Sequence, residues 1–427
     1  MIPAIILFAV TYVLMLIFSK YRPLIALASG IIFLATGMLP IGELLPSIDF
    51  NVLLMIAGTM GLVSLFIESK MPALLADLIM ERVPNVKWAA VSLALFAGVI
   101  SALVDNVATV LMVAPVALEI CKKLKTNPVP FIIGIAVSSN LQGAATLVGD
   151  TTAIMLGSAL DMTFMDFFWF LGKPSIFFAV ELGAVLAAII LAFIFRRERA
   201  PIEKSGERTK VTDYVPTILL CGTVLCLVAA SFAPDAWHLP AEINGIICCS
   251  IFLIGLVYTL IRKKSAKALL APLKDIDFST LGLLLGLFLM IGGIAAEGVI
   301  DAAAGLLAKA GNGNVFLLYT IIVWASVLIS AFIDNIPYVA TMIPVIGGIA
   351  ATLGIDPTCL YFGLLSGATL GGNCTPIGAS ANITGISILR HNAYEVKNKD
   401  FFKIGIPFTL AAIIPAYIYV WLLYGIH

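Results

Sequence analysis

The chain has 427 residues, of which 61% are hydrophobic and 12% are charged, and its formal net charge at pH 7 is zero. Soluble domains carry roughly 25% charged residues, so this chain has too little charge to cover a water-facing surface and must expose apolar surface to lipid. The neutral balance argues against a nucleic-acid partner, and the seven scattered cysteines lack the CxxC spacing of a zinc site.

Apolar runs long enough to span a bilayer recur along the chain, since a spanning helix needs about 20 mostly apolar residues. They are residues 3–19, 24–40, 50–68, 129–159, 175–196, 215–232, 241–262, 278–296, 359–389 and 404–424. Two more apolar stretches, 88–121 and 315–351, are interrupted by Asp-Asn and predict re-entrant hairpins. Residues 72–83 predict a short interfacial helix, and residues 161–169 a second one with Trp169 at headgroup depth.

The sequence thus predicts an all-α polytopic membrane protein with about 10 transmembrane helices, two re-entrant hairpins and two broken helices. Lysine and arginine predict its orientation. With the N-terminus outside, nearly all of the 25 basic residues fall on the cytoplasmic side, and only Lys173 and Lys309 fall outside. The charged segment 201–213 is then a cytoplasmic linker between two halves, residues 1–200 and 214–427.

The two halves contain similar segments at one offset. SALVDNVATVLMVAPV at 101–116 matches SAFIDNIPYVATMIPV at 330–345, and NLQGAATLVGDTTAI at 140–154 matches TLGGNCTPIGASANI at 369–383. In the predicted topology the first copy enters the membrane from the cytoplasm and the second from outside. The chain is therefore predicted to consist of two inverted repeats, the architecture of many secondary transporters, whose binding sites lie at the repeat interface.

Each predicted hairpin places an Asp-Asn pair at its tip, Asp105-Asn106 and Asp334-Asn335. Ionisable side chains inside a membrane are costly and by default mark ion or proton paths. The same residue types also cap helices, so each tip is expected to cap the second helix of its hairpin. Because the apolar spans contain no Lys or Arg, the aspartates at the midplane, Asp150 among them, are predicted to lack a basic counter-ion, which favours a cation, a proton or a neutral solute.

A second pair of polar stretches, Gly143–Thr152 and Gly371–Asn382, interrupts the apolar runs that follow the hairpins. Their glycines and Pro376 disfavour a continuous helix, and unwound backbone at membrane depth is tolerated only where it is buried or lines a cavity. Freed carbonyls there are suited to a cation, whereas the N-terminus of the following half-helix is suited to an anion. The alternative is close helix packing through small residues.

These hairpin and break motifs resemble the ion transporter superfamily, and most closely its citrate-transporter-like branch, which includes arsenite permeases, a sodium–proton antiporter family and the P protein, and is related to divalent anion–sodium symporters. The resemblance covers nearly the whole chain. It implies two inward-pointing hairpins, two broken helices, a homodimer and elevator-type alternating access. The site residues that it implies or that lie in the matching motifs are Asp105, Asn106, Thr109, Asn140, Gly143, Thr146, Asp150, Thr151, Asp334, Asn335, Gly372, Asn373, Thr375, Gly378, Ser380 and Asn382. A coupling sodium ion is expected at Asp105, Asn106, Asn140, Asp334, Asn335 and Asn373.

The chain departs from two branches of this superfamily. Dicarboxylate symporters carry Ser-Asn-Thr at both breaks, whereas this chain has Leu141 and Leu370 at the third position. Arsenite permeases read GDPPN where this chain reads Gly-Asp-Thr-Thr-Ala from Gly149, although Cys374 offers a thiol in the second break. Asp150 after a glycine also resembles part of the motif of intramembrane aspartyl proteases, but the first glycine and a Tyr-Asp partner are missing.

We therefore expect a multi-pass secondary transporter of the plasma membrane, not an enzyme, that moves a small inorganic ion or small organic anion. Coupling to protons or sodium is expected through the three midplane aspartates, with no other cofactor. Sodium–proton exchange and anion or arsenite efflux both remain open, and a channel or a membrane protease are the remote alternatives.

Overall fold

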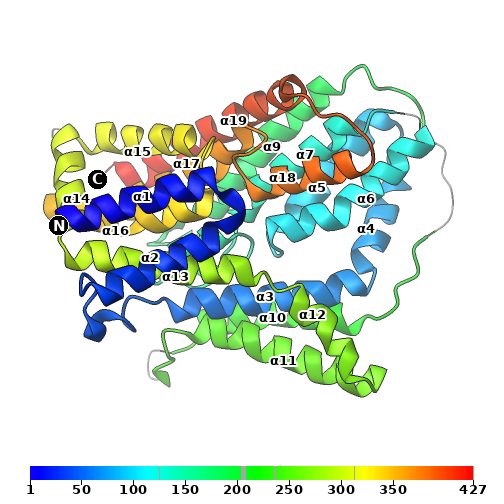
Figure 1. The fold of residues 1–427 in the computed structure, drawn as a ribbon. Helices are drawn as coiled ribbons and strands as arrows, with labels where there is room; N and C mark the ends of the chain where they lie inside the picture. The colour runs from blue at the N-terminus through cyan, green and yellow to red at the C-terminus, as the bar shows by residue number, and fades with distance from the viewer. Residues whose placement is uncertain (125, 203–207, 235–236, 312, 427) are drawn as a thin grey trace.

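The computed structural model describes residues 1–124, 126–202, 208–234, 237–311 and 313–426. The fold is built from helices (Figure 1). Within the described residues, six helices are long and apolar enough to cross a membrane, and the number rises to eight if each of two bent helix pairs forms one span. The chain is a multi-pass membrane protein, as predicted, whereas the number of ten spans stays a prediction.

The helices of the first half are α1 (Ile2–Ile17), α2 (Arg22–Ala35), α3 (Phe50–Glu68), α4 (Met71–Met80), α5 (Val86–Ser101), α6 (Asn106–Leu124), α7 (Val129–Gly143), α8 (Thr151–Ala159) and α9 (Ile176–Ile194). Those of the second half are α10 (Val215–Ser231), α11 (Ile243–Lys263), α12 (Leu270–Lys274), α13 (Phe278–Ala296), α14 (Val299–Ala310), α15 (Val315–Ser330), α16 (Asn335–Leu353), α17 (Thr358–Gly371), α18 (Ser380–His391) and α19 (Asn398–Val420). Short 3-10 turns cover Ser19–Tyr21, Ile41–Glu43, Met165–Phe167, Ala266–Leu269 and Gly372–Cys374, and a π-turn covers Trp421–Gly425.

The helix boundaries repeat along the chain. The starts of α5 and α15 (86 and 315), α6 and α16 (106 and 335), α7 and α17 (129 and 358), and α8 and α18 (151 and 380) all lie 229 residues apart. Both interrupted stretches divide at Asp-Asn, and both later runs break where glycines were expected to break them. The two broken helices are therefore confirmed, while the inverted orientation of the repeats and their boundaries stay predictions.

The segment around Trp169 differs from the prediction of an interfacial helix. It forms a 3-10 turn at Met165–Phe167 and then a two-residue hairpin of β1 (Trp169–Phe170) and β2 (Lys173–Pro174). The Asp166 carboxylate accepts hydrogen bonds of 2.7 Å from both the amide and the hydroxyl of Thr163. This local turn competes with helix formation. The short helix predicted at 72–83 is present as α4, and its location at the membrane interface stays a prediction.

The predicted linker 201–213 is described only at its two ends, because residues 203–207 lie outside the described part. Its second end docks on α4: the Arg208 guanidinium bonds the Glu81 carboxylate at 2.7 Å, and the Asp77 carboxylate accepts from the Thr209 amide at 2.8 Å. The hydrogen bonds that Arg208 donates to the Glu81 carboxylate raise the pKa of Arg208 above its usual value. The cytoplasmic placement of this linker stays a prediction.

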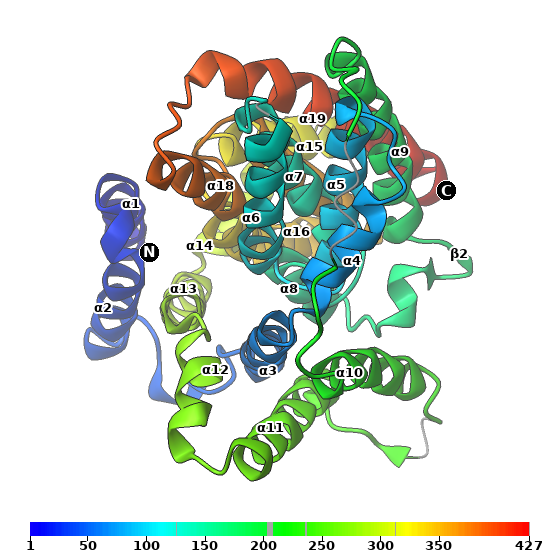
Figure 2. The same cartoon turned by 90° about the vertical axis from the view of Figure 1, so that its right-hand side faces the viewer.

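The helices pack in two groups. The central group comprises α5–α9 and α15–α19, in which α5 packs on α7, α15 on α17 and α9 on α19. The peripheral group comprises α1–α3 and α10–α13 (Figure 2). In this group α2 of the first half packs on α13 of the second, and α11 of the second half packs on α3 of the first. The groups meet where α3 packs on α8 and α13 on α16, and this boundary positions the site.

Candidate functional site

Each hairpin turns because an aspartate caps its second helix. The Asp105 Oδ2 atom accepts hydrogen bonds from the Val107 and Ala108 amides at 3.0 and 3.2 Å. The Asp334 Oδ1 atom accepts from the Ile336 amide at 3.3 Å. An aspartate in this position satisfies amides that a helix leaves unpaired at its start, so the predicted capping role is present at both tips.

Each break is fastened to the hairpin of its own half by the same bond. The Thr146 hydroxyl donates to the Ala102 carbonyl, and the Thr375 hydroxyl donates to the Ala331 carbonyl. Donors and acceptors both keep the 229-residue offset. The two threonines, predicted as site residues, therefore hold the breaks in place with hydroxyls that face backbone.

Close backbone approach requires glycine at one position of each break. A Cβ on Gly149 would lie 2.5 Å from the Gly143 carbonyl oxygen and 2.6 Å from that of Ser101. A Cβ on Gly378 would lie 2.6 Å from the Gly372 carbonyl oxygen and 2.9 Å from that of Ala331. Such distances leave no room for a side chain, so the breaks pack on the hairpins through bare backbone.

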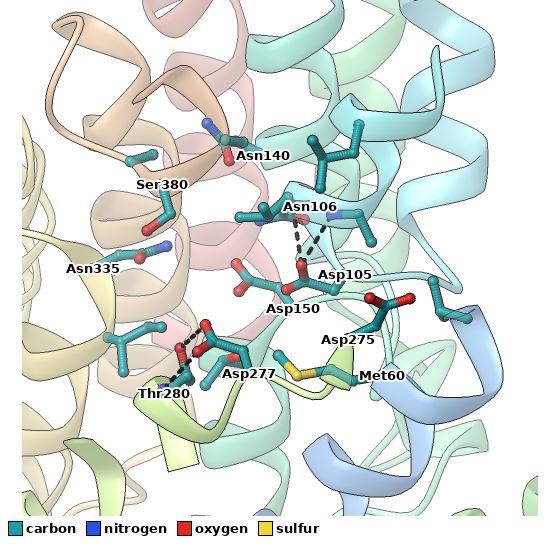
Figure 3. Close-up of a pocket in the computed structure, with 18 of the residues that line it drawn as sticks. Met60, Asp105, Asn106, Asn140, Asp150, Asp275, Asp277, Thr280, Asn335 and Ser380 are labelled. Atoms are coloured by element: carbon teal, nitrogen blue, oxygen red, sulfur yellow. Dashed lines mark hydrogen bonds between the residues drawn. The ribbon is translucent and has the colours of Figure 1, made fainter. Parts of the chain in front are cut away.

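A cavity of about 350 Å³ lies where the first hairpin tip faces the peripheral group (Figure 3). On the central side its wall is formed by the tips and the starts of α8 and α18, and on the peripheral side by α3 and the start of α13. The polar residues that line it are Ser64, Asp105, Asn106, Asn140, Asp150, Thr151, Asp275, Asp277, Thr280, Asn335 and Ser380. Met60, Val63, Ile67 and Leu111 supply much of the apolar wall.

The cavity wall is acidic because four carboxylates line it: Asp105, Asp150, Asp275 and Asp277. None of the residues that line the cavity is Lys, Arg or His. Asp150 caps α8 and accepts the Thr152 hydroxyl at 2.9 Å. The carboxylates are spread around the wall, and within the described residues no three His, Cys, Asp or Glu side chains cluster closely enough to hold one metal ion.

The sequence analysis did not select Asp275, Asp277 or Ser64. The Ser64 hydroxyl donates to Asp275 at 2.6 Å, and Asp277 caps α13 while it accepts the Thr280 hydroxyl at 2.7 Å. The two aspartates directly precede the apolar run 278–296, so they fall outside the predicted spans. A signal was present near the repeat offset, since Asp49 caps α3 just as Asp277, 228 residues later, caps α13.

Asp334 has a basic counter-ion, which corrects the prediction that the midplane aspartates have none. The Arg22 Nη1 atom lies 3.3 Å from Asp334 Oδ2, and the Ser380 hydroxyl donates to the same oxygen at 3.1 Å. Arg22 was placed in a cytoplasmic loop. It is instead the first residue of α2, where the chain bends by 117° between α1 and α2 and directs this residue at the second tip.

Three asparagines join the two breaks across the centre of the molecule. The Asn140 Nδ2 atom donates to Asn373 Oδ1 at 2.8 Å and to Asn382 Oδ1 at 3.1 Å. Asn373 and Asn382 in turn donate to backbone carbonyls. The position equivalent to Asn140 in the second half is Thr369, whose hydroxyl lies 3.1 Å from the Thr152 hydroxyl. Buried amides satisfied in this way rigidify a core.

The predicted site residues thus divide into two sets. Those that line the cavity are Asp105, Asn106, Asn140, Asp150, Thr151, Asn335 and Ser380. Those packed around it without lining it are Thr109, Gly143, Thr146, Asp334, Gly372, Asn373, Thr375, Gly378 and Asn382. Of the residues expected to hold sodium, Asp334 and Asn373 are in the second set. Cys374, considered for arsenite, does not line the cavity either.

The chain is similar in sequence and in fold to known transporters. The sequence profile of the citrate transporter family matches residues 12–367. An uncharacterized transporter of Mycobacterium bovis is 34% identical over 336 residues, covering 78% of this chain and 76% of that protein. The human P protein is 26% identical, covering 86% of this chain and 52% of that protein. The crystal structure of the YdaH transporter of Alcanivorax borkumensis has a similar fold, with a TM-score of 0.62 at 15% identity over 93% of this chain and 90% of that one.

Proposed function

This chain belongs to the citrate transporter family, and from that premise we propose that it is a secondary active transporter of the plasma membrane, coupled to protons or sodium. The cargo is a small ion or small organic anion. The observation that carries the proposal is the cavity lined by four carboxylates and by no basic residue. A wall of one charge in a low-dielectric setting concentrates counter-ions, so this cavity attracts cations and disfavours a free anion.

Asp105 is the carboxylate best placed to bind the coupling ion. The hydrogen bonds that Asp105 accepts from the Val107 and Ala108 amides both go to Oδ2, so Oδ1 is the oxygen left for a ligand. Asp150, in contrast, accepts bonds on both oxygens from Thr152. Carboxylate, amide and carbonyl oxygens suit sodium as a hard cation, and a lone carboxylate also suits a proton. Asn106 and Asn140 offer amide oxygens on the same wall.

The family description favours a carboxylate cargo, whereas the charge of the wall favours a cation. A polyvalent carboxylate such as citrate would enter this cavity only together with bound cations, because its own charge would be repelled. Asn335 and Ser380, at the starts of α16 and α18, supply the opposite wall. Helix N-termini bind anions, so an anion accompanied by its cation would lie between Asp105 and Ser380. Sodium–proton exchange needs only the wall that carries Asp105, Asn106 and Asn140.

The boundary between the helix groups supports alternating access by an elevator motion. The central group carries both tips and both breaks, and the peripheral group supplies the facing wall from α3 and α13. In the predicted topology that wall consists of the cytoplasmic ends of these two helices, so the cavity faces the cytoplasm. Movement of the central group along the peripheral group would expose the tips on the other side. A homodimer through the peripheral group is part of this proposal.

The test uses purified protein in liposomes that contain a trapped pH dye, with empty liposomes as the control. A sodium gradient that drives counter-movement of protons, lost in Asp105→Asn, supports sodium–proton exchange. If sodium gives no signal, citrate, other carboxylates and arsenite are offered under a proton gradient, with and without divalent cations. Transport that survives Asp105→Asn unchanged in both arms, or no transport of any of these solutes, would overturn the proposal.

A further inference from the structure

A partly buried carboxyl group that does not line the cavity lies beside the first break, where α9 packs on α7. The Gln142 Nε2 atom donates to the Glu181 carboxylate in α9, and it lies 3.0 Å from each carboxylate oxygen. Gln142 is 2% exposed and is the penultimate residue of α7. Glu181 is partly buried and lies five residues into α9, about 8 Å along the helix axis.

One acceptor atom of this pair lacks a hydrogen-bond donor, and a proton on the carboxyl group would supply it. The Gln142 Oε1 atom is buried and receives no hydrogen bond from the described residues. A charged carboxylate beside it adds a second acceptor group and no donor. A protonated carboxyl group carries one O–H donor, and a carboxylic acid pairs with an amide through two hydrogen bonds. After a turn of the amide, the protonated form would satisfy Oε1 and remove a charge from the membrane, where an unpaired charge is costly.

Among the described residues, no charged side chain pairs with Glu181. The helices packed on α9 are α5, α7 and α19, and α7 carries no ionisable side chain. The Tyr417 hydroxyl bonds Thr320 and the Tyr419 hydroxyl bonds the Pro174 carbonyl. The ionisable groups on these helices and on the strand before α9 are Lys87, Lys173, Lys399, Asp400, Lys403, Tyr417 and Tyr419, and none makes a hydrogen bond or ion pair with Glu181 in the described part of the chain.

The pair is mechanically connected to the first hairpin tip. The Gln142 amide lies against Gly98 of α5, where a Cβ would meet Oε1 at 1.5 Å. The next residue, Gly143, lies against the Asn106 side chain at the first tip, since a Cβ there would lie 2.2 Å from Asn106 Oδ1. A turn of the Gln142 amide therefore acts on a segment that is held tightly between α5 and the tip.

We propose that Glu181 and Gln142 form a proton-binding site beside the first break, distinct from the cavity. The carboxyl group takes up and releases one proton, and the Gln142 amide turns with it. Its use in the transport cycle rests on the proposed function, whereas the binding of a proton does not. The ligand is a proton and not a metal ion, because the Gln142 amide nitrogen, which donates hydrogen bonds, faces both carboxylate oxygens from the side where a cation would have to bind.

Infrared difference spectroscopy of the full-length purified protein in detergent, recorded as the pH is stepped, tests this directly. The expected result is a C=O stretching band of a protonated carboxyl group that appears as pH falls and is lost in Glu181→Gln. The matched control Glu119→Gln removes an exposed carboxylate from α6 and should leave that band intact. A Glu181→Gln spectrum identical to that of the wild type would overturn the proposal.

Two further variants keep the test decisive. If Glu181→Gln does not fold, the exchanged pair Gln142→Glu with Glu181→Gln retains one carboxyl group and one amide across the same contact. It should restore a titrating band, and a folded exchanged variant without one would contradict the proposal. Asp105→Asn should retain the Glu181 band. Loss of transport in that variant therefore reports on the cavity, and loss of the band in Glu181→Gln reports on this site.

Discussion

The two hairpin tips begin with the same residues and end in different surroundings. Asp105 and Asp334 both precede asparagine, both cap the second helix of their hairpin, and both have a neighbouring break fastened by an equivalent threonine. Asp105 faces an acidic cavity, whereas Asp334 is paired with Arg22 and bonded by Ser380. The repeat thus determines the backbone of each tip. Contacts with segments outside the repeat determine which charged groups surround the aspartate at that tip.

The difference arises outside the repeated segments, in the helix pairs that flank them. The α2 helix packs on α13 and starts with Arg22, which reaches the second tip. The α11 helix packs on α3 in the corresponding place, but its start carries Glu242 and Ile243, and neither is basic. The first tip consequently has no counter-ion among the described residues. Because of this asymmetry, we propose ion binding at Asp105 and a structural contact at Asp334.

The largest expected effect is on ion binding at the first tip. Asp105→Asn should weaken the apparent affinity for the coupling ion by about 30-fold or more, because loss of a buried charged partner costs roughly 2–5 kcal/mol. Asparagine caps helices as well as aspartate does, so the protein should remain folded. Transport against ion concentration in liposomes measures this effect. Glu119→Gln, the same change on the exposed face of α6, is the control and should not alter the curve.

The next prediction concerns the second tip. Arg22→Gln should destabilise the protein by about 1–3 kcal/mol, because it leaves the Asp334 carboxylate without its charged partner. Asp334→Asn in the same chain should recover most of that loss, since it removes the orphaned charge. Thermal unfolding in detergent and a double-mutant cycle measure the coupling.

The same cycle made with Asp105→Asn in place of Asp334→Asn should be additive, because Arg22 contacts only the second tip. In transport, Asp334→Asn should change ion affinity far less than Asp105→Asn does. Equal losses of affinity in the two variants would show that the tips are functionally alike and that the Arg22 contact does not distinguish them.

The two breaks pack on their hairpins in the same way, so equivalent substitutions in them should have equal effects. Gly149→Ala and Gly378→Ala should each destabilise the protein by about 1–3 kcal/mol, because the added methyl group overlaps backbone carbonyl oxygens in both breaks. Gly222→Ala in α10, where a Cβ meets nothing within 4 Å, should be neutral or slightly stabilising. A loss at only one of the two breaks would mean that their packing is not equivalent.

Sequence reasoning predicted the parts of the fold that depend on local pattern. Apolar runs, capping aspartates and clustered glycines determined α3, both tips and both breaks because each signal acts within a few residues. The offset of 229 residues located the paired elements, and the resemblance to the citrate-transporter-like branch is confirmed by family membership. The interfacial helix at 161–169 was wrong because Asp166 closes a local turn that hydrophobic patterning does not reveal.

The parts that could not be predicted depend on contacts between distant segments. Arg22 and Asp334 are more than 300 residues apart, and only the bend between α1 and α2 brings them together. Asp275 joins the cavity because Ser64 of α3 lies opposite it. Glu181 and its partner Gln142 are 39 residues apart, and only the packing of α7 on α9 brings them together. Charge partners across a membrane fold are properties of tertiary structure.

The smallest expected effect tests how far the equivalence of the two halves extends. Thr146→Val and Thr375→Val keep the shape of the side chain but remove the hydroxyl that donates to Ala102 or Ala331. Each should cost about 1 kcal/mol, the net contribution of one hydrogen bond, together with the unpaired buried carbonyl that it leaves. Thr352→Val, at an exposed position of α16, should change unfolding by less than about 0.5 kcal/mol. Because neither threonine hydroxyl faces the cavity, both variants should lower the unfolding temperature and leave ion affinity unchanged. A shift of affinity in Thr146→Val alone would mean that the first break, unlike the second, transmits strain from its hairpin contact to the ion at Asp105.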